Sequence, residues 1–95
     1  MFEHYVMFRL KPGKKGELQT FVKKLMQLEK DVPVIRFSEV LLNGIKAPHS
    51  FDLMFHVRLD DEAAYRAYMA HPKHLPAMKY VAEICDGIAD VDAIR

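Results

Sequence analysis

The chain has 95 residues, of which 51% are hydrophobic, and its formal net charge is only +1. This length corresponds to one domain, residues 1–95, and a domain of this size buries only about two-thirds of the surface that its unfolded chain exposes. The balanced charge and the scattered Lys and Arg residues exclude the basic stripe of a nucleic-acid-binding protein. No run of about 18 apolar residues is present, so we expect no membrane-spanning segment.

The single cysteine, Cys85, cannot form an intrachain disulfide, which favours a reducing compartment. The first residues, MFEHYVMFRLK, lack the basic region and the long apolar region of a signal peptide. We therefore expect a cytoplasmic protein. No glycine-rich phosphate loop is present, and we expect no cofactor.

Residues 2–10 alternate between two faces, with His4 among apolar residues on one face and Glu3, Tyr5 and Met7 on the other, which predicts a strand. Pro12-Gly13 ends it. From Glu17 to about Lys30 the apolar residues recur at helical spacing and predict an amphipathic helix.

A second strand is predicted at about 35–42, where Asn43-Gly44 forms a turn signal. Residues 51–59, FDLMFHVRL, alternate again, with Leu53 and Phe55 on the apolar face and Met54 and His56 on the other.

Asp60 or Asp61 is the expected N-cap of a short helix that carries Tyr65, Tyr68 and Met69 on one side. A further helical segment follows HPKHLP, runs to about Cys85 and is expected to end at Asp86-Gly87. The tail alternates Ile88, Asp90 and Asp92 with Ala89, Val91 and Ala93, as in a last strand.

This order of elements predicts an α+β fold of the ferredoxin-like, split βαβ type, with a four-stranded antiparallel sheet and helices on one face. The face carrying Tyr5, Met7, Met54 and His56 is half apolar and would be exposed in a monomer. We therefore expect a homodimer in which a second sheet covers that face, giving a dimeric α/β barrel.

The segment Tyr68 to His74, YMAHPKH, concentrates groups that transfer protons. If Pro72 takes the first helical position, His71 is the N-cap and the helix dipole favours a neutral His74. If the helix begins at Pro76 instead, this effect weakens. A neutral imidazole can accept a proton while the Tyr68 phenol donates to a carbonyl oxygen, which suits enolate or aldol chemistry.

The segments EHYVMFRLK and FDLMFHVRLDDEAAYRAYMAHPKH, with the short final strand, resemble the stress-responsive α/β-barrel family, often called Dabb. The resemblance covers nearly the whole chain, and Y-x-x-H-P-x-H is its most specific part. It implies dimeric ferredoxin-like barrels and, by similarity to a plant polyketide cyclase of the family, cofactor-free aldol chemistry. It also implies catalytic roles for His74 and Tyr68 and a pocket role for His4. Where that cyclase has a pocket tyrosine and histidine, this chain has Leu25 and Leu53, which predicts a more apolar pocket.

Two other interpretations of the segment stay open. His71 could cap a helix while His74 and Tyr68 serve only as structural hydrogen-bonding groups. Alternatively, His71, His74 and His4 could bind a metal ion, although no carboxylate or cysteine is evident beside them, so we expect none.

We therefore predict a protein that binds a small apolar or aromatic oxygenated molecule. The predicted catalytic residues are His74 and Tyr68, and the predicted binding residues are His4, His71, Leu25, Leu53 and Phe55. The alternatives are a polyketide-cyclase-like aldol cyclase, a cofactor-free monooxygenase, and a non-enzymatic stress protein that acts through assembly. Whether the protein is an enzyme stays open at this stage.

Overall fold

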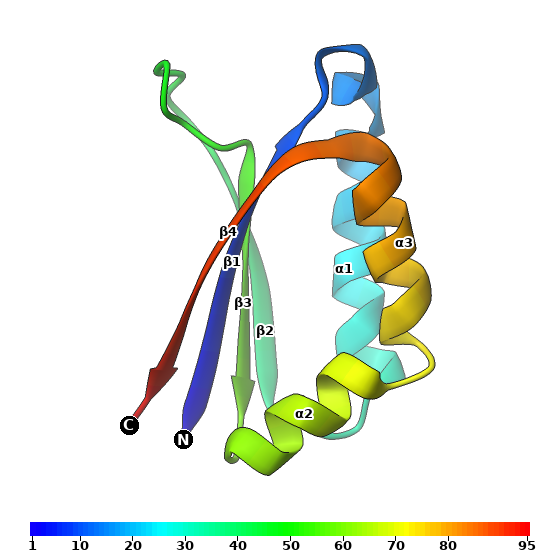
Figure 1. The fold of residues 1–95 in the computed structure, drawn as a ribbon, viewed down its shortest axis with the longest axis vertical. Coiled ribbons are helices and arrows are strands. Elements are labelled where there is room, and N and C mark those ends of the chain that lie inside the picture. The colour runs from blue at the N-terminus through cyan, green and yellow to red at the C-terminus, as the bar shows by residue number, and fades with distance from the viewer.

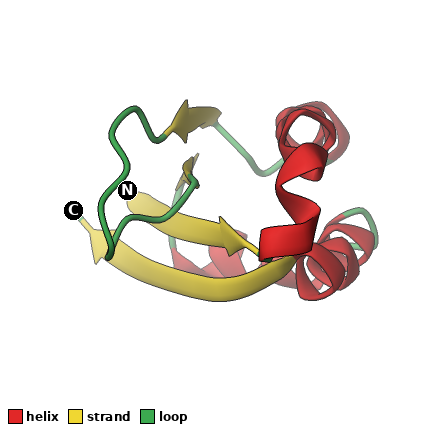
Figure 2. Cartoon of the chain, turned by 90° about the horizontal axis from the view of Figure 1, so that it is seen from above, coloured by secondary structure: helices red, strands yellow, loops and turns green.

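A four-stranded antiparallel sheet with all helices on one face forms the structure, a computed structural model that describes residues 1–95 (Figures 1 and 2). The elements are β1 Phe2–Leu10, a 3₁₀ helix Pro12–Glu17, α1 Leu18–Asp31, β2 Phe37–Leu42, β3 Leu53–Leu59, α2 Glu62–Ala70, α3 His74–Ile84 and β4 Cys85–Ile94. The strand order is β2-β3-β1-β4, which is the ferredoxin-like arrangement. The predicted fold class is confirmed. No helix is long and apolar enough to cross a membrane.

The core lies between the sheet and the helices. The inward residues of β1 and β3 are buried, as their alternating pattern predicts. Phe21, Leu25 and Leu28 of α1 lie at helical spacing and pack against them. The core cluster contains Phe2, Val6, Phe8, Leu10, Phe21, Leu25, Leu28, Val32, Ile35, Leu53, Phe55, Val57, Leu59, Tyr68, Val81, Ile84 and Cys85.

The two termini meet at one end of the sheet, at the lower left in Figure 1. The Met1 ammonium donates to the Arg95 carbonyl oxygen at 2.6 Å, and the Arg95 amide donates back to the Met1 carbonyl oxygen at 2.8 Å. This pairing follows from the antiparallel register of β1 and β4, in which Phe2 is opposite Ile94. The register places His4 opposite Asp92 and Val6 opposite Asp90, on the face toward the helices.

Several predicted boundaries need correction. The helix predicted from Glu17 to about Lys30 is found at Leu18–Asp31, and a separate 3₁₀ helix, Pro12–Glu17, precedes it. The predicted strands 35–42 and 51–59 each begin two residues later. Asp61, not Asp60, caps α2, because its carboxylate accepts from the Ala64 amide at 2.9 Å. Asp60 instead binds the Arg36 guanidinium.

The third helix ends at Ile84, close to the predicted end near Cys85, but Asp86-Gly87 does not form the expected break, because both residues lie inside β4, which follows the helix directly. The Arg9 side chain crosses β4 at this point and donates to the Asp86 carboxylate at 2.9 Å. A β-carbon at position 87 would lie 2.9 Å from the Arg9 guanidinium. The guanidinium is the flexible end of an exposed side chain that can shift, so this close approach does not make glycine obligatory at position 87.

The sheet face opposite the helices differs in part from the prediction. Met7 is exposed as expected, but Glu3 and His56 are both buried within the single chain. The His56 ring stacks on Tyr5 with centroids 4.3 Å apart, and its nitrogens face the carboxylates of Glu3 and Glu39. His56 is thus covered by its own chain before any partner binds.

Candidate functional site

The α2–α3 junction positions the most polar part of the predicted site. His71 is the C-terminal cap of α2, and its carbonyl oxygen accepts from the His74 amide at 2.9 Å. His74 is therefore the first residue of α3, and neither Pro72 nor Pro76 begins the helix. Pro76 is tolerated because amide groups in the first turn of a helix need no helical acceptor.

His74 is held as a neutral imidazole with a defined tautomer. Its Nδ1 lies 3.1 Å from the Met69 carbonyl oxygen, and a carbonyl can only accept, so Nδ1 carries the hydrogen. Nε2 is then unprotonated. Burial lowers the pKa of His74, and the nearby imidazoles of His4 and His71 lower it further, against the opposing effect of the Met69 bond. The dipole of α3 acts in the same direction as burial.

Tyr68 lies against His74, with ring centroids 4.4 Å apart. The residue is buried as a whole, but its hydroxyl forms no hydrogen bond within the protein and is not a fully buried polar atom, so it opens to the adjoining space. Burial raises the pKa of Tyr68 well above its ordinary value, so the phenol stays protonated. It can therefore donate a hydrogen bond to a ligand in the adjoining cavity.

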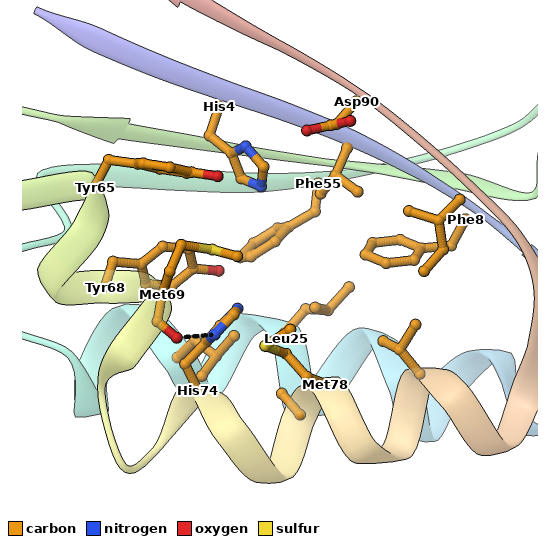
Figure 3. Close-up of a pocket in the computed structure, with 15 residues that line it drawn as sticks. His4, Phe8, Leu25, Phe55, Tyr65, Tyr68, Met69, His74, Met78 and Asp90 are labelled. Atoms are coloured by element: carbon orange, nitrogen blue, oxygen red, sulfur yellow. Dashed lines mark hydrogen bonds between the residues drawn. The ribbon is translucent and has the colours of Figure 1, made fainter. Parts of the chain in front are cut away.

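His4 and Tyr65 extend this row of rings (Figure 3). The His4 centroid lies 6.4 Å from Tyr68 and 5.4 Å from Tyr65. His4 Nδ1 contacts the Asp92 carboxylate across the β1–β4 pair. Burial raises the pKa of Tyr65, and the charges of Asp92 and Asp90 raise it further.

These groups surround a cavity of about 250 Å³ between the sheet and the helices. Of the predicted site residues, the structure brings together His4, Leu25, Phe55, Tyr68 and His74 at its wall. Its other lining residues are Val6, Phe8, Leu28, Tyr65, Met69, Ala77, Met78, Val81, Ile88 and Asp90. The wall is mostly apolar, and its polar side chains lie in two groups: His74 and Tyr68 in one, and His4, Tyr65 and Asp90 in the other.

The structure does not bring His71 and Leu53 to this cavity. The His71 ring turns back to its own loop, where Nδ1 accepts from the Lys73 amide at 3.1 Å. Leu53 is buried near the other end of the sheet and borders a separate hollow with Met7 and Leu41. His71 is predicted as a site residue from its closeness to His74 in the sequence, and Leu53 is predicted from the family resemblance. Neither argument specifies where a side chain lies along the sheet.

Sequence reasoning missed Tyr65, Asp90 and Asp92 as site residues. Tyr65 lies three residues before Tyr68 on the same face of α2, and this spacing was a usable signal. The two aspartates alternate along β4 on the face toward the helices, opposite Val6 and His4. Their position depended on the pairing register, which the sequence pattern alone does not determine.

One group of side chains could hold a metal ion. The donor atoms of His4, Asp90 and Asp92 all lie within 4.8 Å of one another, and imidazole with two carboxylates suits a divalent cation. His71 and His74 belong to no such group of three. The His4–Asp92 contact occupies the donor atoms in the present arrangement.

The fold and the cavity together define a ferredoxin-like α+β domain with a small internal pocket. The model of the stress responsive A/B barrel domain, Dabb, matches residues 2–94, and the chain belongs to that family. Among curated proteins, no relative matches the chain.

Solved structures share the fold over the whole chain. A dimeric ferredoxin-like protein from Bacteroides fragilis is 26% identical, with a TM-score of 0.85 and coverage of 99% of this chain and 95% of that one. A Dabb family protein from Mesorhizobium loti is 21% identical, with a TM-score of 0.85 and the same coverage. The hydroxynitrile lyase of Passiflora edulis is 14% identical, with a TM-score of 0.88 and coverage of 99% and 92%.

Proposed function

We propose that the protein binds a small aromatic or apolar carbonyl compound in the cavity and catalyses removal of a proton next to the carbonyl group. The observation that carries this proposal is the pairing of His74 and Tyr68 at one wall. His74 presents an unprotonated Nε2, and Tyr68 presents a free phenol. A base and a hydrogen-bond donor are the two groups that enolate formation requires.

In the proposed step, His74 Nε2 takes the proton from the carbon next to the carbonyl group. The electron pair of that C–H bond forms the enolate, and its negative oxygen accepts a hydrogen bond from Tyr68. The enolate carbon then takes the proton back from His74 Nε2, or it attacks a second carbonyl group in an aldol reaction. In the aldol reaction, the alkoxide that forms takes the proton from His74 Nε2. No cofactor is needed, because His74 both accepts and returns the proton.

The apolar wall supports the reaction in two ways. Leu25, Leu28 and Phe55 exclude water from the space beside His74, which strengthens the hydrogen bond from Tyr68 to a developing charge. They also complement a ring or a short alkyl chain by apolar burial. A cavity of about 250 Å³ is below the usual range of about 300–1,000 Å³ for ligand pockets, so a one-ring molecule is the expected size.

The experiment uses acetophenone as the probe and follows exchange of its methyl protons for deuterium in D₂O by NMR. We expect the protein to accelerate exchange. Tyr68→Phe and His74→Ala should each reduce the acceleration by about 10²–10⁴-fold, the usual contribution of an acid–base partner. Tyr80→Phe and His49→Ala are the matched controls, because neither residue lines the cavity.

Circular dichroism melts accompany each variant. If exchange is not accelerated, or if the controls lose as much rate as the site variants, the proposed reaction is wrong. If the site variants melt at a lower temperature while the folded protein below that temperature binds ligand unchanged, Tyr68 and His74 are structural hydrogen-bonding groups.

We also propose that the protein works as a homodimer. Its structural neighbours from Bacteroides fragilis and Thermobifida fusca are dimeric, and the sheet face opposite the helices carries exposed Met7, Leu41 and Val91. A second sheet packed on this face would bury these side chains and leave the cavity, on the other face, in each subunit.

A further inference from the structure

The charged side chains at the mouth of the cavity are negative only. Asp90 is the sole carboxylate among the fifteen lining residues, and no lysine or arginine lines the cavity. Asp90 lies opposite Val6 in the register of β4 with β1 and is exposed to solvent. Figure 3 shows it beside His4, at the opposite side of the cavity from His74.

Asp92 reinforces this charge. It lies two residues further along the same face of β4 and contacts His4, and its donor atom lies within 4.8 Å of one on Asp90. Burial is the largest cause of the raised pKa of Tyr65, and the negative charges of Asp92 and Asp90 come next. The field of the two carboxylates therefore reaches the Tyr65 phenol at the mouth of the cavity. The nearby cation, Arg66, acts in the opposite direction, but its guanidinium is exposed and bound to Glu62 at 2.7 Å.

Asp90 itself has no side-chain partner. Asp92 is engaged by His4, whereas Asp90 makes neither a hydrogen bond nor a salt bridge with another side chain. The walls behind it carry the rings of Phe8, Phe55 and Tyr65, whose faces attract cations. A free carboxylate above aromatic rings favours a positively charged group and repels an anion.

We propose that the cavity accepts a one-ring carbonyl compound that carries a protonated amine, and that Asp90 binds the ammonium group and excludes carboxylates. This inference rests on the proposed function, because it takes the carbonyl end of the ligand to lie at Tyr68 and His74. The ammonium end lies at the mouth, where solvent still reaches it. Asp90 is thus a specificity-determining residue and takes no part in proton transfer.

Three probes with the same aromatic ketone core test the inference: acetophenones with an aminomethyl, a hydroxymethyl or a carboxylate group in the para position. Dissociation constants are measured by NMR titration, and proton exchange is measured on the same samples. We expect the amine to bind about two- to fivefold more tightly than the alcohol, and the alcohol more tightly than the carboxylate, as for one solvent-screened ion pair. High salt should reduce these differences.

Asp90→Asn should remove this order of affinities, so that the three probes bind with similar dissociation constants. Asp86→Asn is the matched control on the same strand, where the carboxylate is bound to Arg9 outside the cavity, and it should keep the order. Equal binding of the three probes to the unmodified protein overturns the inference and leaves the proposed function standing. If Asp90→Asn keeps the same order of affinities, the inference is also overturned. Absence of both binding and exchange for all three probes overturns the proposed function and the inference together.

Discussion

The Met69 carbonyl oxygen lies 3.1 Å from His74 Nδ1, across the turn that joins α2 to α3. This contact determines which nitrogen of His74 carries the hydrogen and leaves Nε2 as a free acceptor. The turn is short because His71 ends α2 and its carbonyl oxygen accepts from the first amide of α3. The tautomer of the proposed base is therefore a consequence of local backbone geometry.

The first prediction concerns the titration of His74. Because burial lowers its pKa, the imidazole should titrate below the ordinary value of 6.5. The unfolded chain then binds a proton more readily than the folded one, so His74 reduces stability progressively as the pH falls below 6.5. ¹⁵N NMR of the imidazole should show an unprotonated Nε2 at neutral pH, and the rate of proton exchange should fall on the acid side.

A His74 signal that titrates above 6.5, or a protonated Nε2 at neutral pH, would contradict the assignment of His74 as a base.

The second prediction concerns Glu3, which is buried on the sheet face away from the helices, beneath the guanidinium groups of Arg58 and Arg95 and the ring of His56. Burial acts to raise its pKa, but hydrogen bonds from Arg58 and His56 and the charge of Arg95 outweigh burial, and the pKa is lowered. A carboxylate with a lowered pKa stabilises the fold at neutral pH, and this contribution is lost as the pH falls below 4.5 and through the folded-state value.

Glu3→Gln should therefore lower the melting temperature at neutral pH, because Arg58 and Arg95 lose a shared anionic partner, and should weaken the dependence of stability on acid pH. Glu83→Gln, at an exposed position of α3, should change neither. Melting curves between neutral pH and pH below 4.5 measure both effects. An unchanged acid profile in Glu3→Gln would show that Glu3 has no part in acid stability.

Much of this fold is predictable from the periodic spacing of apolar residues alone. The alternation in β1 places His4 on the core face among Phe2, Val6 and Phe8, and the structure buries all four. The helical spacing in α1 likewise places Leu25 toward the sheet. These outcomes follow because one face of each element must be removed from water, whatever the neighbouring elements are.

The site was less predictable, because it depends on where elements lie along one another. Leu53 has the same inward orientation as Phe55, yet only Phe55 reaches the cavity. His56 has the outward orientation that alternation predicts, but pairing with Glu3 buries it. The alternation of apolar and polar residues shows on which face of a strand a side chain lies. The pairing register and long neighbouring side chains determine whether that side chain is buried.

The third prediction is that His71 and His74 bind no transition metal. His74 Nδ1 is used by the Met69 carbonyl oxygen, His71 Nδ1 is used by the Lys73 amide, and no third ligand joins them. Elemental analysis of protein purified without a histidine tag should find no stoichiometric zinc or other transition metal. A metal that is lost in His71→Ala would contradict the prediction, whereas one lost only in Asp92→Asn would belong to the separate group of His4, Asp90 and Asp92.

The last prediction concerns the homodimer. The register aligns Leu41, Met54 and Met7 in one row across β2, β3 and β1, on the sheet face away from the helices. Met7 and Leu41 are exposed in the single chain, so a row of apolar side chains faces water unless a partner covers it. An aspartate in the middle of this row would lie unpaired in a dimer interface, which is costly, but would be solvated in a monomer.

Met54→Asp should therefore weaken or abolish the dimer while the monomer keeps its fold. Met26→Asp is the matched control, because Met26 is exposed on α1, on the helical side of the molecule. Sedimentation velocity at micromolar concentration should show a dimer for the unmodified protein and for Met26→Asp, and a shift toward monomer for Met54→Asp. A stable monomer of the unmodified protein would contradict the dimer itself, whereas a dimer that is equally weakened by both substitutions would place the interface elsewhere.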